Sequence, residues 1–325
     1  MQCHNPPLKY LITGGAGFIG SHLSEELISR GHEVVVLDDF STGTMENLKA
    51  ISQHSNFNLI NGNIKDSEVV ARLVRESDGV FHLAAAVGVQ KILIDPIGSL
   101  ETNIKGSENV LFSATKFNKR VMVASTSEIY GKNSEVPLTE ISDRVLGSPL
   151  LSRWTYSEAK AIDEAISYTL FKREGLKVQI VRFFNTVGPR QSSSYGMVIP
   201  TFMSSAINNR NLKVNGTGMQ QRVFCHVYDA IQGVLALWDS GAGYGEAFNL
   251  GGFEETSILD LAKRIITLVG STSKIELIPY SQLTEFGFED MLRRVPDTSK
   301  LQLATGWKAK IGLEQILRDV RKSFV

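Results

Sequence analysis

The 325-residue sequence contains only two cysteines, Cys3 and Cys225, which lie far apart in the chain. Two distant thiols cannot form a disulfide framework. Neither cysteine has the companions that a structural zinc site requires, and we therefore predict no metal. The scarcity of cysteine also favours a reducing compartment.

Net charge and long apolar runs are also missing. Lys+Arg and Asp+Glu both number 34, so no overall field attracts nucleic acid or an anionic membrane, and local groups have to hold any anionic ligand. The apolar runs have the length of strands, and residues 1–7 lack the apolar core of a signal peptide. We expect a cytoplasmic protein without membrane or nucleic-acid partners.

A glycine-rich turn follows the first predicted strand, residues 9–13, and leads into a helix with an apolar stripe. The first glycine permits the tight turn, the second lets a pyrophosphate approach the backbone, and the third lets the helix pack on the strand. The free amides of the first helical turn then form an anion site. The residues of this turn that we predict to bind a dinucleotide are Gly14, Gly17, Phe18, Ile19 and Gly20.

A second apolar strand, residues 33–37, ends in Asp38, eighteen residues after Gly20. A carboxylate at this place can accept both hydroxyls of an adenosine ribose, and it repels the 2′-phosphate of NADP. We therefore predict NAD as the cofactor. The alternative is that Asp38 is merely a solvated residue at the end of a strand.

Apolar strands and amphipathic helices continue to alternate, with strands expected at 57–60, 79–83 and 120–124 and helices near 67–76 and 96–117. This order predicts an α/β protein with a Rossmann-type doubly wound parallel sheet. Ligands bind such sheets at the carboxyl ends of the strands. The polar groups expected at those ends are Gly14, Asp38, Asn63, residues 84–86 and residues 125–128.

Tyr156 and Lys160 stand four residues apart on a predicted helix that ends near Glu174. At this spacing two side chains share a helix face. A nearby ammonium favours the phenolate, which makes Tyr156 a candidate general base. The alternative is a solvated helix face. The apolar stripe that we expect to pack this helix is Ala159, Ile162, Ala165, Ile166 and Leu170.

The regular alternation ends after a strand expected at 177–183. Beyond Gly188 the content of glycine, proline and polar residues rises. We expect an NAD-binding Rossmann domain over residues 1–187 and a smaller, interleaved α/β substrate lobe that takes up most of 188–325. A predicted helix at 227–238 and a predicted strand at 247–250 are the segments expected to return to the first domain.

Six motifs in order resemble the extended short-chain dehydrogenase/reductase family of nucleotide-sugar enzymes, over nearly the whole chain. They are residues 13–20, Asp38, residues 82–85, residues 125–131, the Tyr156/Lys160 pair and residues 182–190. The resemblance implies bound NAD, a nucleotide-diphosphate sugar as substrate, and a homodimer. It implies that Tyr156 is the base, that Lys160 bridges the nicotinamide ribose and the phenol, and that Ser125 or Thr126 holds the sugar hydroxyl.

The resemblance also extends to residues around the cofactor and the substrate. The further cofactor-binding residues that it implies are Asn63, Ile64, Leu83, Ala84, Ala85 and Asn103, and the substrate-binding residues are Asn185, Arg190, Arg222 and Arg294. The family often has a Gly-Asp pair where this chain has Gly62-Asn63, which leaves the adenine contacts open.

The residues before Tyr130 separate the reactions that this family carries out through a 4-keto sugar. Dehydratases have Asp-Glu where this chain has Ser127-Glu128, which disfavours a 4,6-dehydratase. A 4-epimerase needs no carboxylate and would leave Glu128 unexplained. UDP-glucuronate decarboxylases have the same Ser-Thr-Ser-Glu, and they also resemble this chain at residues 153–156 and 294–296.

Decarboxylation also agrees with elementary chemistry. A β-keto acid loses CO2 readily, so the enzyme has to oxidise C4, orient the carboxylate and protonate C5. Arg294 offers a planar fork for the carboxylate, with diphosphate binding as its alternative role. The predicted catalytic residues are Ser125, Thr126, Ser127, Glu128, Tyr156, Lys160 and Arg294. We expect a UDP-glucuronate decarboxylase, with a UDP-sugar 4-epimerase or a non-catalytic NAD-binding scaffold as alternatives.

Overall fold

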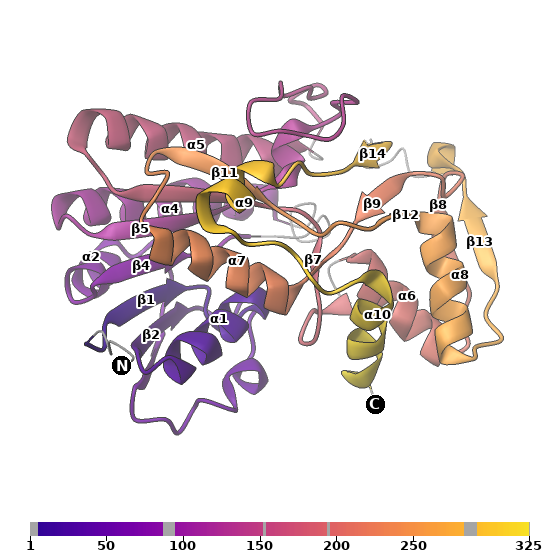
Figure 1. Ribbon diagram of the computed structural model, residues 1–325, viewed down its shortest axis with the longest axis horizontal. Coiled ribbons are helices and arrows are strands. Elements are labelled where there is room, and N and C mark those ends of the chain that lie inside the picture. The colour runs from indigo at the N-terminus through magenta and orange to yellow at the C-terminus, as the bar shows by residue number, and fades with distance from the viewer. Residues whose placement is uncertain (1–5, 87–94, 152–153, 194–195, 283–290, 325) are drawn as a thin grey trace.

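A seven-stranded parallel sheet forms the centre of the larger lobe in the computed structural model, which describes residues 6–86, 95–151, 154–193, 196–282 and 291–324 (Figure 1). The strand order is β11-β6-β5-β4-β1-β2-β3, so the predicted α/β class and Rossmann-type sheet are confirmed. The strands are β1 (Lys9–Thr13), β2 (Glu33–Asp38), β3 (Phe57–Asn61), β4 (Gly79–His82), β5 (Arg120–Thr126), β6 (Val178–Phe183) and β11 (Glu246–Leu250).

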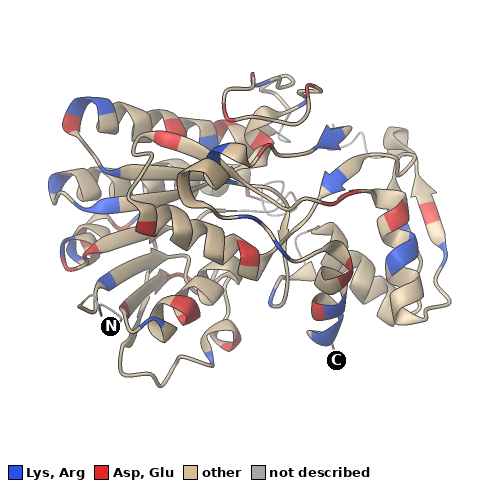
Figure 2. Ribbon diagram, viewed as in Figure 1, with Lys and Arg blue, Asp and Glu red and all other residues tan. Residues whose placement is uncertain are grey.

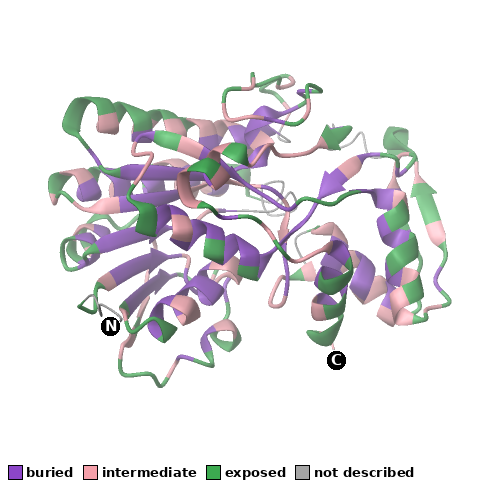
Figure 3. Cartoon of the chain, viewed as in Figure 1, coloured by how far each residue is buried: buried purple, intermediate pink, exposed green. Residues whose placement is uncertain are grey.

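Each face of the sheet buries its own apolar cluster, because successive side chains of a strand point to opposite faces. Tyr10 and Ile12 of β1 belong to one cluster and Leu11 to the other. The first face is covered by α1 (Phe18–Ser29) and α7 (Val227–Ser240), and the second by α2 (Ser67–Arg75), α4 (Pro96–Lys116) and α5 (Thr155–Glu174). The strands inside the edge strand β3 are therefore mostly buried, while the outer helix surfaces are exposed (Figure 3).

A smaller α/β lobe lies beside the main sheet and has a core of its own. Its helices are α6 (Val198–Ile207), α8 (Ile258–Val269) and α10 (Leu313–Lys322), with the parallel pair β8 (Leu212–Asn215) and β13 (Ile275–Ile278). A three-stranded sheet has the order β12-β9-β14, from β12 (Glu255–Ser257), β9 (Gln221–Val223) and β14 (Arg293–Arg294). Between the lobes, β7 (Thr186–Val187) pairs with β10 (Cys225–His226). Elements α6, α10, β7, β8, β9, β10, β12, β13 and β14 were not predicted.

The chain crosses between the two lobes more than once. Strand β11 pairs with β6 at the edge of the main sheet, and α9 (Ser299–Thr305) packs against α7 and β11. The buried carboxylate of Asp229 on α7 accepts hydrogen bonds from the backbone amides of Lys310 and Ile311, at 2.8 and 2.7 Å. The domain boundary near residue 187 stays a prediction.

The inward face of α5 matches the predicted stripe in part, because Ala159 is buried and Ile166 and Leu170 pack against the core. Ile162, which we expected to be buried, is 40% exposed, and Ala165 is exposed as well. The buried side chains include Lys160 and Asp163. The physical reason is that α5 packs over α4 and β5, where polar groups of the helix find buried partners.

Charged residues of both signs are interspersed over both lobes (Figure 2), as the equal counts of acidic and basic residues suggested. Within the described ranges, no helix is long and apolar enough to cross a membrane. The same ranges contain no group of three or more His, Cys, Asp or Glu side chains that could hold a metal ion.

Candidate active site

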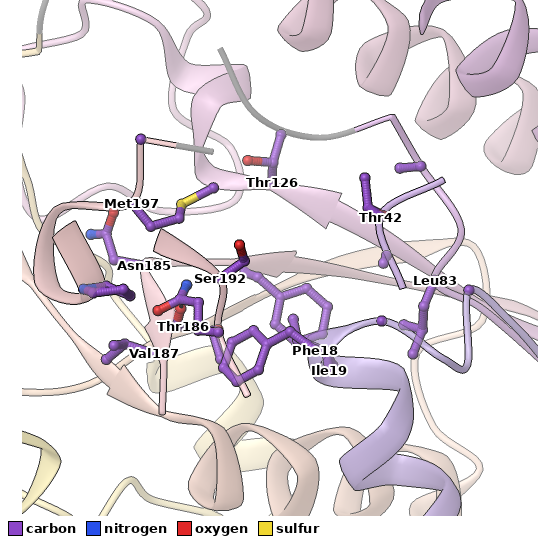
Figure 4. Close-up of a pocket in the computed structure, with 18 of the residues that line it drawn as sticks. Phe18, Ile19, Thr42, Leu83, Thr126, Asn185, Thr186, Val187, Ser192 and Met197 are labelled. Atoms are coloured by element: carbon purple, nitrogen blue, oxygen red, sulfur yellow. Dashed lines mark hydrogen bonds between the residues drawn. The ribbon is translucent and has the colours of Figure 1, made fainter. Parts of the chain in front are cut away.

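A cavity of about 720 Å³ lies at the carboxyl ends of the main-sheet strands and extends to the smaller lobe. Figure 4 shows its wall, with Phe18 and Ile19 from the start of α1, Thr126 from β5 and Met197 from the approach to α6. The predicted residues that line the cavity are Gly14, Gly17, Phe18, Ile19, Gly20, Asp38, Ile64, Leu83, Ala84, Ala85, Ser125, Thr126, Ser127, Glu128, Tyr156, Asn185, Arg190, Arg222 and Arg294.

The glycine-rich turn has no room for side chains. Gly14 has a φ of +72°, and a Cβ there would lie 2.8 Å from the backbone of Ala84, at the end of β4. A Cβ on Gly20 would lie 2.2 Å from the carbonyl oxygen of Gly14. No side chain caps the first turn of α1, whose N-cap is Gly17. The turn is thus a backbone cradle at a helix N-terminus, the arrangement that binds phosphate groups.

Asp38 is fixed at the edge of this cradle. Its carboxylate accepts hydrogen bonds from the backbone amides of Ala16, at 2.9 Å, and Phe40, at 2.8 Å. The side chain is 7% exposed and lines the cavity. Because each carboxylate oxygen has more than one lone pair, a fixed Asp38 can still accept hydroxyl groups from a ligand.

Asn63 and Asn103 do not line the cavity, although we expected both to contact the cofactor. Asn63 donates to the carboxylate of Asp39 at 2.7 Å. Asn103 accepts from the backbone amide of Ala86 at 2.7 Å and donates to its carbonyl oxygen at 3.3 Å. Both side chains are occupied in holding the loops after β2 and β4, so their contribution to the cavity wall is indirect.

Tyr156 lines the cavity at the start of α5. Burial raises the pKa of its phenol above the ordinary value, and the negative charges of Glu128 and Asp163 raise it further. The spacing had led us to expect a pKa lowered by Lys160. In the structure Lys160 does not line the cavity, because its ammonium turns inward and donates to Asp163 Oδ2 at 2.7 Å.

Ser125 and Thr126 differ in what their hydroxyls can do. Ser125 Oγ donates its proton to Glu164 Oε1 at 2.5 Å, so this hydroxyl cannot also donate to a ligand. Thr126 Oγ1 accepts from the backbone amide of Glu128 at 3.1 Å, which leaves its proton available. Of the two alternatives for holding a sugar hydroxyl, the geometry favours Thr126.

A buried network fixes the floor beneath these hydroxyls. Glu164 forms a two-pronged ion pair with Arg182 of β6, at 2.9 and 2.6 Å, and the two side chains are 12% and 11% exposed. Arg182 also donates to the hydroxyl of Tyr130 at 2.8 Å. That hydroxyl donates to Asn249 of β11 at 2.6 Å. Three neighbouring strands are thereby connected below the cavity.

Glu128 and Arg294 form an ion pair at the cavity wall, with 2.7 Å between Arg294 Nη1 and Glu128 Oε1. Arg294 also donates to Ser127 Oγ at 3.3 Å. Since β14 pairs with β9, Arg294 lies opposite Arg222 in the register. The neighbouring Arg293 points elsewhere, to Glu255, and its side chain is 50% exposed. The smaller lobe thus places Arg294, and not Arg293, beside Glu128.

The other cations and amides at the wall have separate positions. Arg190 is paired with Glu25 of α1 at 2.6 Å, so it lies on the side of the glycine-rich turn. Asn185 donates to the carbonyl oxygen of Val223 at 2.8 Å. Wall residues that the sequence reasoning missed come from the smaller lobe and its approach, and include Thr186, Ser192, Met197, Lys213, Asn215 and Gln220. Thr186 lies within the 182–190 motif but was given no role, whereas no motif marks the others, and Lys213 and Asn215 lie on an unpredicted strand.

The chain matches the sequence model of the family described as GDP-mannose 4,6 dehydratase over residues 11–320. It is 39% identical over 319 residues to a UDP-N-acetyl-alpha-D-glucosaminuronate decarboxylase of Bacillus cytotoxicus, with 97% of each chain covered. It is 37% identical over 321 residues to UDP-glucuronic acid decarboxylase 1 of Xenopus tropicalis, with 95% of this chain and 72% of that one covered.

A solved structure is similar over the same extent. The UDP-glucuronic acid 4-epimerase of Bacillus cereus, in complex with UDP-glucuronic acid and NAD, has a TM-score of 0.88 and 25% identity, with 97% of this chain and 98% of that one covered. Fold and site define an extended short-chain dehydrogenase/reductase. The chain belongs to the GDP-mannose 4,6-dehydratase family within that class, which confirms the resemblance drawn from its motifs.

We expect Glu164→Ala to lower the free energy of unfolding by about 3–5 kcal/mol, because it leaves the buried Arg182 guanidinium without its counterion. The matched control is Glu158→Ala on the same helix. Glu158 is 46% exposed and pairs with Arg144 at 3.1 Å, so its loss is expected to cost less than about 1 kcal/mol. Urea unfolding measures the free energy of unfolding of both variants. An equal decrease in the two would contradict the role given to Glu164.

Proposed function

We propose that the protein is an NAD-dependent UDP-glucuronate decarboxylase that acts through a 4-keto sugar. The observation that carries this proposal is the Glu128–Arg294 pair, which places a planar cation and a carboxylate on the cavity wall that also holds Tyr156. Such a cation is suited to the carboxylate of a uronic acid. The two decarboxylases at 39% and 37% identity support the same reaction class.

The residues at the glycine-rich turn fit NAD. The cradle at Gly14 and Gly20 excludes side chains and suits a pyrophosphate, while Asp38 suits the hydroxyls of the adenosine ribose. NAD would supply the acceptor and donor of a hydride at C4 of the sugar.

Tyr156 and Thr126 act on the sugar hydroxyl at C4. Thr126 donates a hydrogen bond that orients the oxygen, and Tyr156 takes the hydroxyl proton and later returns it. The raised pKa of Tyr156 means that few of the phenols are ionised at neutral pH. Activity should therefore rise with pH as the phenolate forms.

Arg294 and Glu128 act on the carboxylated end of the keto sugar. Arg294 binds and orients the substrate carboxylate. The C5–C6 bond breaks, its electrons move into the C4 carbonyl as an enolate, and CO2 leaves. C5 then takes one proton, for which Glu128 is the proposed donor. Glu128 regains that proton from solvent, so the reaction consumes one proton overall.

Two other outcomes are distinguishable by experiment. A UDP-glucuronate 4-epimerase is the second candidate, favoured by the similarity to the Bacillus cereus enzyme. A 2-acetamido substrate is the third, because the relative with 39% identity is named for it.

Purified protein with NAD should be incubated in parallel with UDP-glucuronate and with its 2-acetamido counterpart. We expect UDP-glucuronate to give CO2 and a UDP-pentose, and NMR of the reaction mixture identifies the sugar product. Turnover to UDP-galacturonate without CO2 would replace the proposal with the epimerase. Release of CO2 from the 2-acetamido sugar but not from UDP-glucuronate would make the 2-acetamido sugar the proposed substrate. No turnover of either sugar by NAD-loaded protein would favour the non-catalytic scaffold.

We expect Arg294→Gln to reduce the rate of CO2 release about 100-fold, because a neutral amide cannot hold the substrate carboxylate as a charged fork does. Arg293→Gln is the matched control, since the adjacent guanidinium pairs with Glu255 away from the cavity. Its rate should stay within about twofold of the wild type. Equal losses in the two variants would remove Arg294 from the proposed chemistry.

We also propose that the protein is a homodimer that pairs through the outer surface of α4 and α5. The exposed apolar side chains of these helices include Phe112, which is 52% exposed, Ile162, which is 40% exposed, and Tyr168, which is 51% exposed. Exposed apolar groups on adjacent helices suit a helix-to-helix interface.

Light scattering after size-exclusion chromatography should give twice the mass of the chain. Ile162→Asp should give the monomer, because it buries a charge in the proposed interface. Ile141→Asp is the control, since Ile141 is 93% exposed and lies outside α4 and α5. This variant should remain dimeric. A monomeric wild type would refute the interface.

A further inference from the structure

Asn249 of β11 is a buried amide whose side-chain hydrogen-bonding groups are all used. The residue is 0% exposed. Its Oδ1 accepts a hydrogen bond from the hydroxyl of Tyr130 at 2.6 Å. Its Nδ2 donates to the carbonyl oxygens of Leu138, at 2.9 Å, and Asp297, at 3.3 Å. One amide thus joins three segments that lie far apart in the chain.

The partners of Asn249 leave its amide only one orientation. A backbone carbonyl oxygen accepts and never donates, so the NH2 group has to face Leu138 and Asp297. The hydroxyl of Tyr130 receives a hydrogen bond from Arg182 at 2.8 Å, and its own proton is directed to Asn249. This position therefore requires two donors and one acceptor on a short side chain, which is the set that asparagine supplies.

Two of the three segments carry the residues of the Glu128–Arg294 pair. Tyr130 is the last residue of the short helix that contains Glu128. Asp297 stands three residues after Arg294, at which β14 ends. The guanidinium of Arg294 lies 2.7 Å from the carboxylate of Glu128. Asn249 therefore ties together the two pieces of backbone from which the pair projects.

The third segment completes this connection. The amide of Leu138 donates to the carbonyl oxygen of Val295, and its carbonyl oxygen accepts from the amide of Asp297, both at 2.8 Å. The same carbonyl oxygen accepts from Asn249. Strand β14 itself pairs with β9 of the smaller lobe. The chain around Arg294 is thus fixed by β9 on one side and by the contacts of Asn249 and Leu138 on the other.

We propose that Asn249 is a positioning residue that sets the distance between Arg294 and Glu128. It does not itself line the cavity. The inference rests on the proposed function, in which Arg294 and Glu128 act on the carboxylated end of the sugar while Tyr156 acts at C4. A displaced Arg294 should therefore slow the loss of CO2 and spare the oxidation at C4. An amide that served stability alone would lower both rates together, through the fraction of folded protein.

The test follows both steps in NAD-loaded protein at saturating UDP-glucuronate. Asn249→Leu keeps the approximate volume of the side chain and removes its hydrogen bonds. A misplacement of about 1 Å can cost about 100-fold in rate, and we expect the release of CO2 to fall about 10-fold. Formation of reduced nicotinamide in the first turnover should stay within about threefold of the wild type. Equal losses in the two steps would overturn the proposal.

The Arg294→Gln background shows whether Asn249 acts through Arg294. In that background, Asn249→Leu should lower the release of CO2 by less than about twofold, because the group that it positions is already gone. If the losses of the two substitutions multiplied, Asn249 would act independently of Arg294 and the proposal would fail.

The matched control is Gln179, a second buried amide that is 0% exposed and lies near the amino end of β6, away from the cavity. Its Nε2 donates to the carbonyl oxygens of Leu237 and Ala242, and its Oε1 accepts from Arg120. Gln179→Met should make the protein less resistant to urea, because it leaves buried polar groups without partners. The ratio of CO2 release to nicotinamide reduction should stay within about twofold of the wild type. A change of this ratio as large as that of Asn249→Leu would overturn the proposal.

Tyr130→Phe keeps the test decisive if Asn249→Leu does not fold, because it preserves the ring and removes one hydrogen bond of Asn249. The ratio of CO2 release to nicotinamide reduction should fall in this variant as well. An unchanged ratio would overturn the proposal.

A crystal structure of either variant without sugar gives a readout that does not depend on the reaction. The distance between Arg294 Nη1 and Glu128 Oε1 should exceed about 3.5 Å, beyond hydrogen-bond range. A distance that stayed at 2.7 Å would overturn the role of Asn249 whatever the substrate. A wild type that releases no CO2 would overturn the proposed function and leave this distance measurement as the test of Asn249.

Discussion

The parallel register of the main sheet is the constraint on which the site depends. Strands β1, β2, β4, β5 and β6 all run in one direction, so their carboxyl ends meet at one edge. The turn after β1 can approach the end of β4 because Gly14 has no side chain. The same edge receives Asp38 from β2 and Thr126 from β5. The smaller lobe then closes the cavity from the other side.

Charge pairing is the second organising principle. Glu164 with Arg182, Glu128 with Arg294 and Lys160 with Asp163 each place a carboxylate against a cation near the cavity. A buried charge without a counterion is expensive, so these pairs keep the site electrically balanced. A substrate that carries a carboxylate changes that balance at Arg294, where Glu128 already holds the guanidinium. In the proposed mechanism, the substrate carboxylate and Glu128 share the Arg294 guanidinium.

One fold serves decarboxylases and a 4-epimerase among the relatives and similar structures of this chain. The features that could separate these reactions are local. We propose that they lie in the short helix η2 (Ser127–Tyr130), which carries Glu128, and in the two-residue strand β14, which carries Arg294. Glu128 and Arg294 are 166 residues apart in the chain. They meet because β14 pairs with β9 and the residues after β14 pair with Leu138. In the proposed function, small elements at the edge of a common sheet select the reaction.

The sequence by itself determined the main sheet, the glycine-rich turn and the place of Tyr156, because continuous apolar strands and a glycine-rich turn are local patterns. It did not predict α6, β8 or β13, since short elements of a small lobe have weak periodicity. Only the tertiary structure decided which polar partners meet: Ser125 is committed to Glu164, and Lys160 to Asp163. Those choices depend on which face of α5 turns toward β5 and α4, and that rotation is set by packing between distant segments, which no spacing along the chain encodes.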